Sequence, residues 1–284
     1  MANITAQQVK ELRDKTGAGM ADCKKALEES KGEMQTAIEF LRKKGAASVE
    51  KRADRDTNEG VVSTKVSDNG QIASIAKITC ETDFVARNEE FIDFANTIAT
   101  VVYDKSPKDK DELLATTLNG SKVEDKYNEI LSKFSEKIEV GQFERINTSG
   151  YLVDYIHGGS KLGVIVEVSS AKINDEARVL VRDIAMQVAA MNPSFLDRTS
   201  VTQEILDKEK EIYKQQAQEE GKPADIAEKV AEGRINKFYK ENCLVEQQYV
   251  KDGNMTINDV LKKISEKVGE EVKINQFVRY SIGG

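Results

Sequence analysis

The sequence contains one histidine and no tryptophan among its 284 residues. A metal site built from several histidines is therefore excluded, and a Ser-His-Asp or Cys-His catalytic arrangement could use only His157. The sequence also lacks a GxxxxGK(S/T) phosphate-binding loop and a GxGxxG turn after a strand. With so few catalytic groups, the chain is expected to bind a partner rather than to act as an enzyme.

Cysteine is also scarce, with three widely spaced residues and no CxxC pair. An odd number at this spacing argues against a disulfide framework and against a structural zinc site. Cys23 and Cys80 both lie in apolar patterns, so we expect them to be buried free thiols. One enzymatic alternative remains, in which Cys80 beside Asp83 acts as a nucleophile, although no base lies nearby in the sequence.

The chain has no long apolar run and no surplus of positive charge. Its formal net charge is -7, which argues against a general nucleic-acid binder, because phosphate neutralisation requires a basic surface. No apolar stretch has the length of a membrane span, and no basic segment followed by an apolar one begins the chain. The composition, 39% hydrophobic and 32% charged residues, is that of a globular protein, which we predict to be cytoplasmic.

The N-terminal residues carry the 3.6-residue apolar period of short helices. Thr5 and Gln8 have the spacing of a capping box at the start of the first helix. The third helix is expected to end at Gly45, since glycine is favoured just beyond helix ends. We therefore predict a compact three-helix domain over residues 1–45 and a charged linker over 46–58.

The pattern then changes to extended segments, and one internal repeat stands out. Residues 130–138 match residues 260–268 at five of nine positions, and each copy precedes a segment with the composition of a strand. These strands, 140–146 and 274–280, share Gln, Phe and Arg. A helix followed by a strand, used twice, predicts a core of two related halves. The helix of the first copy is expected to run from about Val123 to Ile138. An Asn-Gly pair at Asn69 predicts a hairpin with a type I′ turn in the first half.

Between the two copies lies a segment dense in Glu, Lys and Gln, with helical patterns over 202–218 and 224–240. They predict an antiparallel coiled-coil hairpin that projects from the core. Its charged surface is either a solvated face or a docking site. The expected seam pairs Ile205, Ile212 and Tyr213 with Ile226, Val230 and Phe238. We predict an α+β fold, divided after the linker into a first core half (59–148), a second core half (149–198 and 242–284) and the hairpin insertion (199–241).

Two polar segments at predicted strand ends are candidate sites. After the strand that ends near Cys80, Phe84 lies between Asp83 and Arg87, before a helix capped by Asn88. Phe84 is either an exposed apolar contact or a core residue. The second segment contains His157, followed by two glycines, and it is either a partner contact or only a polar turn.

Four segments together resemble the elongation factor Ts family, of the bacterial type since no transit segment leads the chain. They occur in the order of that family and cover nearly the whole chain. The segments are TGAGMADCKKAL (16–27), TDFVAR (82–87), HG (157–158) with LGVIV (162–166), and GKP (221–223) with EKVAEGR (228–234).

The resemblance implies a function and a set of contact residues. The N-terminal domain would be of the ubiquitin-associated (UBA) type, and the chain would promote GDP release from elongation factor Tu without a cofactor of its own. Contacts with the nucleotide domain of that partner are implied for Arg13 and Met20, although Ala21 replaces a second methionine of some relatives. Dislocation of the partner's Mg²⁺ is implied for Thr82, Asp83, Phe84 and Val85, and a further partner contact for His157 and Gly158.

The strongest alternative function is that of a coiled-coil scaffold or adaptor, which would bind a protein without accelerating nucleotide release. The oligomeric state, such as a homodimer or a 2:2 complex with the partner, is not determined by the sequence. Some relatives continue into a C-terminal helix that also contacts the partner, and we expect this contact to be missing here, since the chain stops shortly after Tyr280.

Overall fold

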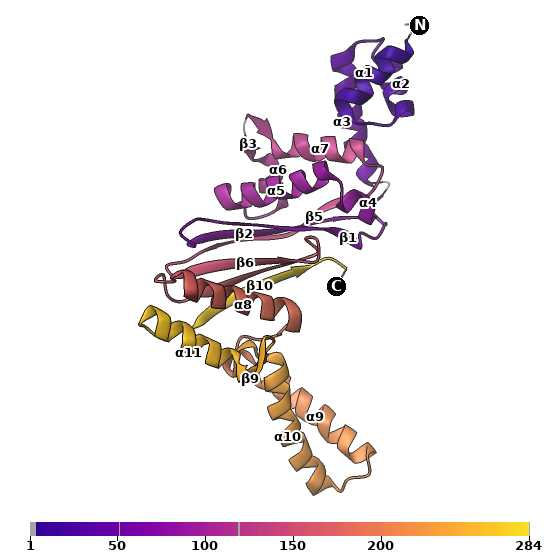
Figure 1. Ribbon diagram of the computed structural model, residues 1–284. Helices are drawn as coiled ribbons and strands as arrows, with labels where there is room; N and C mark the ends of the chain where they lie inside the picture. Colours follow the sequence, from indigo (N-terminus) through magenta and orange to yellow (C-terminus); the bar gives the residue numbers. More distant parts are fainter. Residues whose placement is uncertain (1–3, 51, 119, 284) are drawn as a thin grey trace.

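The computed structural model describes residues 4–50, 52–118 and 120–283. Three parts follow one another along the chain (Figure 1). A group of three helices lies at the N-terminus, two small sheets with their helices form the centre, and a pair of helices projects at the opposite end. The predicted α+β class with three N-terminal helices is confirmed.

The N-terminal helices are α1 (Ala6–Thr16), α2 (Met20–Glu29) and α3 (Met34–Glu50). The predicted capping box is present, since the Gln8 amide donates to the Thr5 hydroxyl and the Gln8 side chain accepts from the Thr5 amide. The end predicted for the third helix is wrong, because α3 continues through Gly45 into the segment assigned to the linker. Gly45 is followed by two alanines, whose high helix propensity favours continuation.

The first core half contains a three-stranded antiparallel sheet in the order β1 (Glu59–Val66), β2 (Ile72–Cys80) and β5 (Ile138–Asn147). The long helix α5 (Glu89–Lys105) covers its outer face, and α7 (Val123–Lys133) packs against α5 (Figure 1). Smaller elements of this half are α4 (Asp83–Ala86), α6 (Lys110–Ala115), β3 (Thr117–Leu118) and β4 (Ser121–Lys122).

The second core half repeats this arrangement. Its sheet has the order β6 (Tyr151–His157), β7 (Leu162–Val168) and β10 (Ile274–Ser281), again antiparallel. The helices α8 (Asp175–Met191) and α11 (Ile257–Val268) cover its outer face. The smaller elements are η1 (Arg198–Ser200), η2 (Leu244–Glu246), β8 (Gln248–Tyr249) and β9 (Asp252–Thr256).

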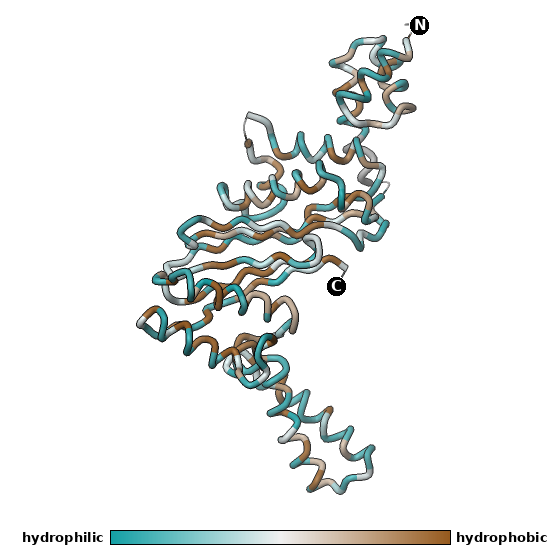
Figure 2. Tube along the Cα trace, in the orientation of Figure 1, coloured by the Kyte–Doolittle hydropathy of each residue, from teal (hydrophilic) through white to brown (hydrophobic). Residues whose placement is uncertain are grey.

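Both halves therefore follow one topology: a hairpin, two helices and a third strand that pairs with the second strand of the hairpin. This agrees with the repeat seen in the sequence. The inner faces of the two sheets pack against each other through apolar side chains such as Ile75 and Ile165, both fully buried. Figure 2 shows hydrophobic residues concentrated along the strands. The result is a core of four layers, with the sheets inside and the helices outside (Figure 1).

Two local expectations in the first half are corrected. The helix expected to reach Ile138 ends at Lys133, and Ile138 begins β5, because its partner in β2 is Cys80. The hairpin between β1 and β2 exists, but its turn is not type I′, which needs positive φ at both central residues. Only Gly70 of the Asn-Gly pair has a positive φ, and its amide donates to the carbonyl of Ser67.

The projecting hairpin consists of α9 (Gln203–Glu219) and α10 (Ala224–Asn242), which pack along each other. Ion pairs cross between the two helices, for example from Lys210 to Glu228. The predicted seam is wrong for two residues, since Ile212 and Ile226 are 38% and 46% exposed. Small side chains take their place, because close packing of two helices favours them: Ala217, Ala227 and Ala231 are fully buried. That this hairpin is a coiled coil stays a prediction.

Among the described residues, no helix combines the length and the apolar character that a membrane crossing would need. The division into domains that the sequence suggested stays a prediction.

Candidate functional site

The most conspicuous surface feature is Phe84, whose side chain is 83% exposed. It lies on α4, a single helical turn that follows β2 directly. The two residues after it, Val85 and Ala86, are buried at 7% and 6% exposure and fix the turn to the core. Of the two readings that the sequence left open, the core position for Phe84 is wrong and the exposed position is correct. An exposed phenylalanine on an anchored turn is suited to insertion into a partner.

The turn that carries Phe84 is capped by Thr82. Its hydroxyl accepts a hydrogen bond from the Val85 amide, the usual N-cap contact, at 3.5 Å. That hydroxyl also donates to one carboxylate oxygen of Glu136 at 2.6 Å, and the Thr82 amide donates to the other at 3.0 Å. Glu136 lies in the segment between α7 and β5, so the start of α4 is held by a residue distant in sequence.

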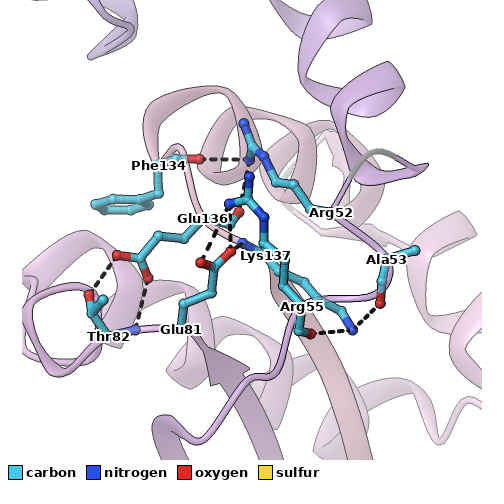
Figure 3. Close-up of polar contacts among 8 residues, drawn as sticks. All are labelled: Arg52, Ala53, Arg55, Glu81, Thr82, Phe134, Glu136 and Lys137. Atoms are coloured by element: carbon cyan, nitrogen blue, oxygen red, sulfur yellow. Dashed lines mark hydrogen bonds and ion pairs between the residues drawn. The ribbon is translucent and has the colours of Figure 1, made fainter.

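Glu81 extends this network on the other side of the chain (Figure 3). Its carboxylate accepts hydrogen bonds from the Lys137 amide at 2.5 Å and from Arg55 at 3.1 Å. Burial by itself would raise the pKa of Glu81, but these hydrogen bonds outweigh it and lower the pKa. The carboxylate is therefore ionised at neutral pH, and it joins the end of β2 to the chain that leads from α3.

That chain is also bound to the segment between α7 and β5. The guanidinium of Arg52 donates to the carbonyls of Phe134 and Glu136 at 3.1 and 2.8 Å. In return, the Lys137 ammonium donates to the carbonyls of Ala53 and Arg55 at 2.7 and 3.0 Å. Figure 3 shows these contacts and, to their left, those between Glu136 and Thr82. The exit of the N-terminal helices and the base of α4 therefore share one hydrogen-bonded framework.

Two charged residues flank Phe84 on α4. Arg87 forms an ion pair with Asp83 at 3.1 Å, with the Asp83 side chain 39% and the Arg87 side chain 78% exposed. Exposed pairs of this kind add little stability. Both groups are thus available to a partner that contacts Phe84.

The thiol of Cys80 is unsuited to nucleophilic chemistry. It is buried and donates to the Thr82 carbonyl at 3.2 Å. Burial, with the nearby charges of Glu136 and Glu59, raises its pKa to about 12, so the reactive thiolate is absent at neutral pH. Cys23 and Cys243 are likewise buried free thiols, as the sequence predicted for Cys23.

His157 ends β6 and is exposed. Its ring stacks on that of Tyr155 at a centroid distance of 5.9 Å, and its Nδ1 lies 2.9 Å from the Tyr155 hydroxyl. Gly158 and Gly159 follow with φ of 62° and 65°, a conformation that favours glycine. The tight turn leaves the imidazole at the surface, held on one side by tyrosine.

The structure brings the two candidate segments to one end of the core. α4 packs against β1, and the turn after His157 also contacts β1, where the Val62 amide donates to the Ser160 carbonyl at 2.7 Å. Lys161 adds an ion pair with Glu59 at 2.7 Å. Phe84 and His157 therefore border the same end of the first strand.

Arg13 and Met20 belong to a separate surface on the N-terminal helices. Both are exposed, and Met20, at the first position of α2, is 48% exposed. These helices rest on α7, where the Ser132 hydroxyl donates to the Leu41 carbonyl at 3.0 Å. The predicted contact residues thus form one group on the N-terminal helices and one on the core.

Sequence reasoning missed the supporting residues, above all Glu136 and Glu81. A helix expected to reach Ile138 placed Glu136 on a solvated helix face, where a glutamate is unremarkable. Ending that helix at Lys133 would have put Glu136 and Lys137 in a connection next to a strand. Among the described residues, no cluster of His, Cys, Asp or Glu is arranged to hold a metal ion.

Comparison with known proteins agrees with the segments that form this site. The family model described as "Elongation factor TS" matches residues 81–284, a range that begins at the base of α4. The chain belongs to the elongation factor Ts family. Elongation factor Ts of Chlorobium phaeobacteroides (strain BS1) is 47% identical over 288 residues, which cover 100% of both chains. Elongation factor Ts of Clostridium perfringens (strain SM101 / Type A) is 46% identical over 282 residues, 99% of this chain and 93% of the relative.

A third relative, elongation factor Ts of Chloroherpeton thalassium (strain ATCC 35110 / GB-78), is 44% identical and covers 100% of this chain and 99% of its own. The match therefore includes the N-terminal helices as well as the core. Elongation factor Ts is the nucleotide exchange factor for elongation factor Tu, and it carries out no covalent chemistry. The family assignment and the unreactive thiol of Cys80 both exclude the nucleophile hypothesis.

Proposed function

We propose that this chain binds the GDP-bound form of elongation factor Tu and promotes GDP release by disturbing the Mg²⁺ and phosphate site of that partner. The observation that carries the proposal is the 83% exposure of Phe84 on a turn whose neighbours are buried. A residue on an unanchored loop would have to be ordered on contact, whereas the backbone that carries this ring is already fixed by the buried Val85 and Ala86.

In this mechanism Phe84 enters between helices of the partner that carry its nucleotide-binding loops. Mg²⁺ demands near-octahedral coordination, so a small shift of its ligands weakens its binding. Without the cation, the phosphates of GDP lose their charge compensation and the nucleotide dissociates. Asp83 accepts hydrogen bonds from the displaced partner segment, while Thr82 and Val85 hold the turn in place.

The remaining contact residues provide docking rather than displacement. Arg13 and Met20 contact the nucleotide domain of the partner, and His157 with Gly158 contacts a neighbouring surface. Docking energy drives the displacement, because the coupling between two ligands of one protein is reciprocal. If this chain weakens the binding of GDP to elongation factor Tu, GDP weakens the binding of this chain by the same factor. Each coupling of about 1.4 kcal/mol changes affinity tenfold, so a few such increments accelerate release by orders of magnitude.

The finer architecture belongs to the same proposal. The N-terminal helices α1, α2 and α3 form a UBA-like domain, and the hairpin of α9 and α10 is a coiled coil inserted in the second half. The chain acts in the cytoplasm, where translation takes place. The complex with elongation factor Tu is either a 1:1 complex or a 2:2 complex through a homodimer, and sedimentation of the purified complex separates the two.

The deciding experiment measures release of a fluorescent GDP analogue from purified elongation factor Tu, with excess unlabelled nucleotide, with and without this chain. We expect a large acceleration at substoichiometric amounts. Phe84→Ala is expected to lower the exchange rate far more than the stability. Asp83→Ala and His157→Ala, tested singly, are expected to have smaller effects.

A folded chain that binds a matched elongation factor Tu without accelerating GDP release would contradict the proposal. That result would favour the scaffold or adaptor function instead. Equal losses of stability and exchange in Phe84→Ala would mean that the residue supports the fold rather than the displacement.

A further inference from the structure

The segment 134–137 between α7 and β5 contacts two regions that are distant in sequence. Its Glu136 carboxylate binds Thr82 at the base of α4, while its backbone and Lys137 bind the chain that follows α3. Figure 3 shows both sets of contacts. Together with the pair formed by Arg55 and Glu81, this segment provides a polar connection between the turn that carries Phe84 and the chain leading from the N-terminal helices.

We infer that Glu136 is a positioning residue for Phe84 in nucleotide exchange, an inference that rests on the proposed function. α4 has four residues, too few to be stable as an isolated helix, so its direction depends on the packing of Val85 and Ala86 and on how its N-cap residue, Thr82, is held. Both carboxylate oxygens of Glu136 bind Thr82, one through the hydroxyl and one through the amide. Two contacts to one residue fix its orientation, which a single contact would leave free to rotate.

The geometry of Glu136 is itself restrained. Hydrogen bonds to a carboxylate are stronger than those between neutral groups. Arg52 donates to the carbonyl of Glu136 at 2.8 Å, so the backbone that carries the carboxylate is held as well. In addition to the packing of Val85 and Ala86, the position of Phe84 is thereby restrained by a residue that lies 54 positions from Thr82.

The second half of the core contains a hydrogen bond comparable to that between Thr82 and Glu136, but no exposed aromatic side chain comparable to Phe84. Ser170, two residues beyond β7, donates to Glu270 in the connection between α11 and β10. Among residues 169–174, all of which the structure describes, no large apolar side chain is exposed. Glu270 is therefore a matched control: a glutamate in the corresponding connection, with a hydroxyl partner after the corresponding strand, but no exposed aromatic residue to orient.

The test compares Glu136→Ala with Glu270→Ala in the release of fluorescent GDP from elongation factor Tu, measured over a range of factor concentrations. For Glu136→Ala we expect the maximal release rate to fall about tenfold, the size of effect typical for loss of a charged hydrogen-bond acceptor. The concentration at half-maximal rate should stay within about twofold, because the docking residues are unchanged. Glu270→Ala is expected to behave like the unmodified chain.

A double-mutant cycle identifies the route of the effect. Because Glu136 acts through Phe84, Glu136→Ala should lower the rate less than about twofold further in a Phe84→Ala background. Glu136→Gln keeps one acceptor oxygen and should retain a rate between those of the unmodified chain and Glu136→Ala. The same comparison serves if Glu136→Ala does not fold, since Glu136→Gln preserves the shape of the side chain.

Three results would overturn the inference. The first is an unchanged release rate in Glu136→Ala or, if only the glutamine variant folds, in Glu136→Gln. The others are an equal loss of release rate in Glu270→Ala, or the same loss from Glu136→Ala with and without Phe84. These differ from failure of the proposed function. If Phe84→Ala itself releases GDP as fast as the unmodified chain, the displacement mechanism fails whatever Glu136 does. If Phe84→Ala is slow and Glu136→Ala is not, only the role of Glu136 fails.

Discussion

The two core halves share a topology but differ in what their connections carry. In the first half, β2 leads into α4 with its exposed Phe84, and only short elements separate α5 from α7. In the second half, the chain passes from β7 to α8 without an exposed large apolar residue, and the α9–α10 hairpin lies between α8 and α11. The sheets thus provide a common support, and the specialised features lie in the connections, as is usual for binding sites.

The interiors of the halves differ as well. Two fully buried phenylalanines, Phe91 and Phe94, lie at the centre of the first, and the ring of Phe94 stacks on Tyr127 at a centroid distance of 5.7 Å. The second is packed mainly with aliphatic residues such as Ile184. Among the described residues, the half that carries the anchored turn is therefore the one with fully buried phenylalanine rings.

The largest expected effect is a loss of stability, and it should differ between these two interiors. Phe94→Ala should reduce the free energy of unfolding by about 4 kcal/mol, because a large cavity forms where a ring stack was. In the second half, Ile184→Val should cost about 1 kcal/mol, since only one methyl group is removed. Urea unfolding followed by circular dichroism measures both. Similar losses would mean that the first interior tolerates lost volume better than the second, because Phe94→Ala removes far more side-chain volume than Ile184→Val.

A pH effect should distinguish the two sheets. Glu167 on β7 is buried, and burial alone would raise its pKa, but hydrogen bonds from Asn275, Thr148 and Gln276 outweigh it and lower the pKa. The stability that these bonds contribute is present above the ordinary glutamate pKa of about 4.3 and is lost as the pH falls through the folded-state value. In the first sheet, the buried polar residues of the described strands carry hydroxyl groups: Ser63, Ser74 and Thr79.

Glu167→Gln is accordingly expected to weaken the acid dependence of unfolding. We would compare urea midpoints at pH 7 and at pH 3 to 4, with Glu144→Gln on β5 of the first sheet as the control for loss of one carboxylate. The unmodified chain and the control should lose stability on acidification more steeply than Glu167→Gln. Parallel pH profiles for all three would contradict the assignment.

The smallest expected effect concerns the most exposed apolar residue of each half. Phe84 and Val179 are 83% and 60% exposed, so changing either to alanine removes little buried area. Each variant should unfold within about 0.5 kcal/mol of the unmodified chain. In the exchange assay the two should differ, with Phe84→Ala slow and Val179→Ala unchanged. A large loss of stability in Phe84→Ala would mean that the ring supports the core after all.

Local interactions made much of this fold predictable from the sequence. The capping box of Thr5 and Gln8 and the cap of α5 at Asn88 depend on residues within a few positions of one another. The repeat similarly predicted two related halves, because each copy keeps its helix and strand in the same order. The family resemblance added the identity of the contact residues, which periodicity alone left ambiguous for Phe84 and His157.

The tertiary structure decided what depends on contacts between distant segments. The sequence pattern around Phe84 fits a core residue as well as an exposed one, and only the packing of Val85 and Ala86 selects between them. The carboxylate of Glu136 could not be assigned either, since its partner Thr82 lies 54 positions away and is brought near by the pairing of β2 with β5. Backbone preferences act over one or two turns of a helix, whereas exposure and long-range hydrogen bonds exist only after the sheets have formed.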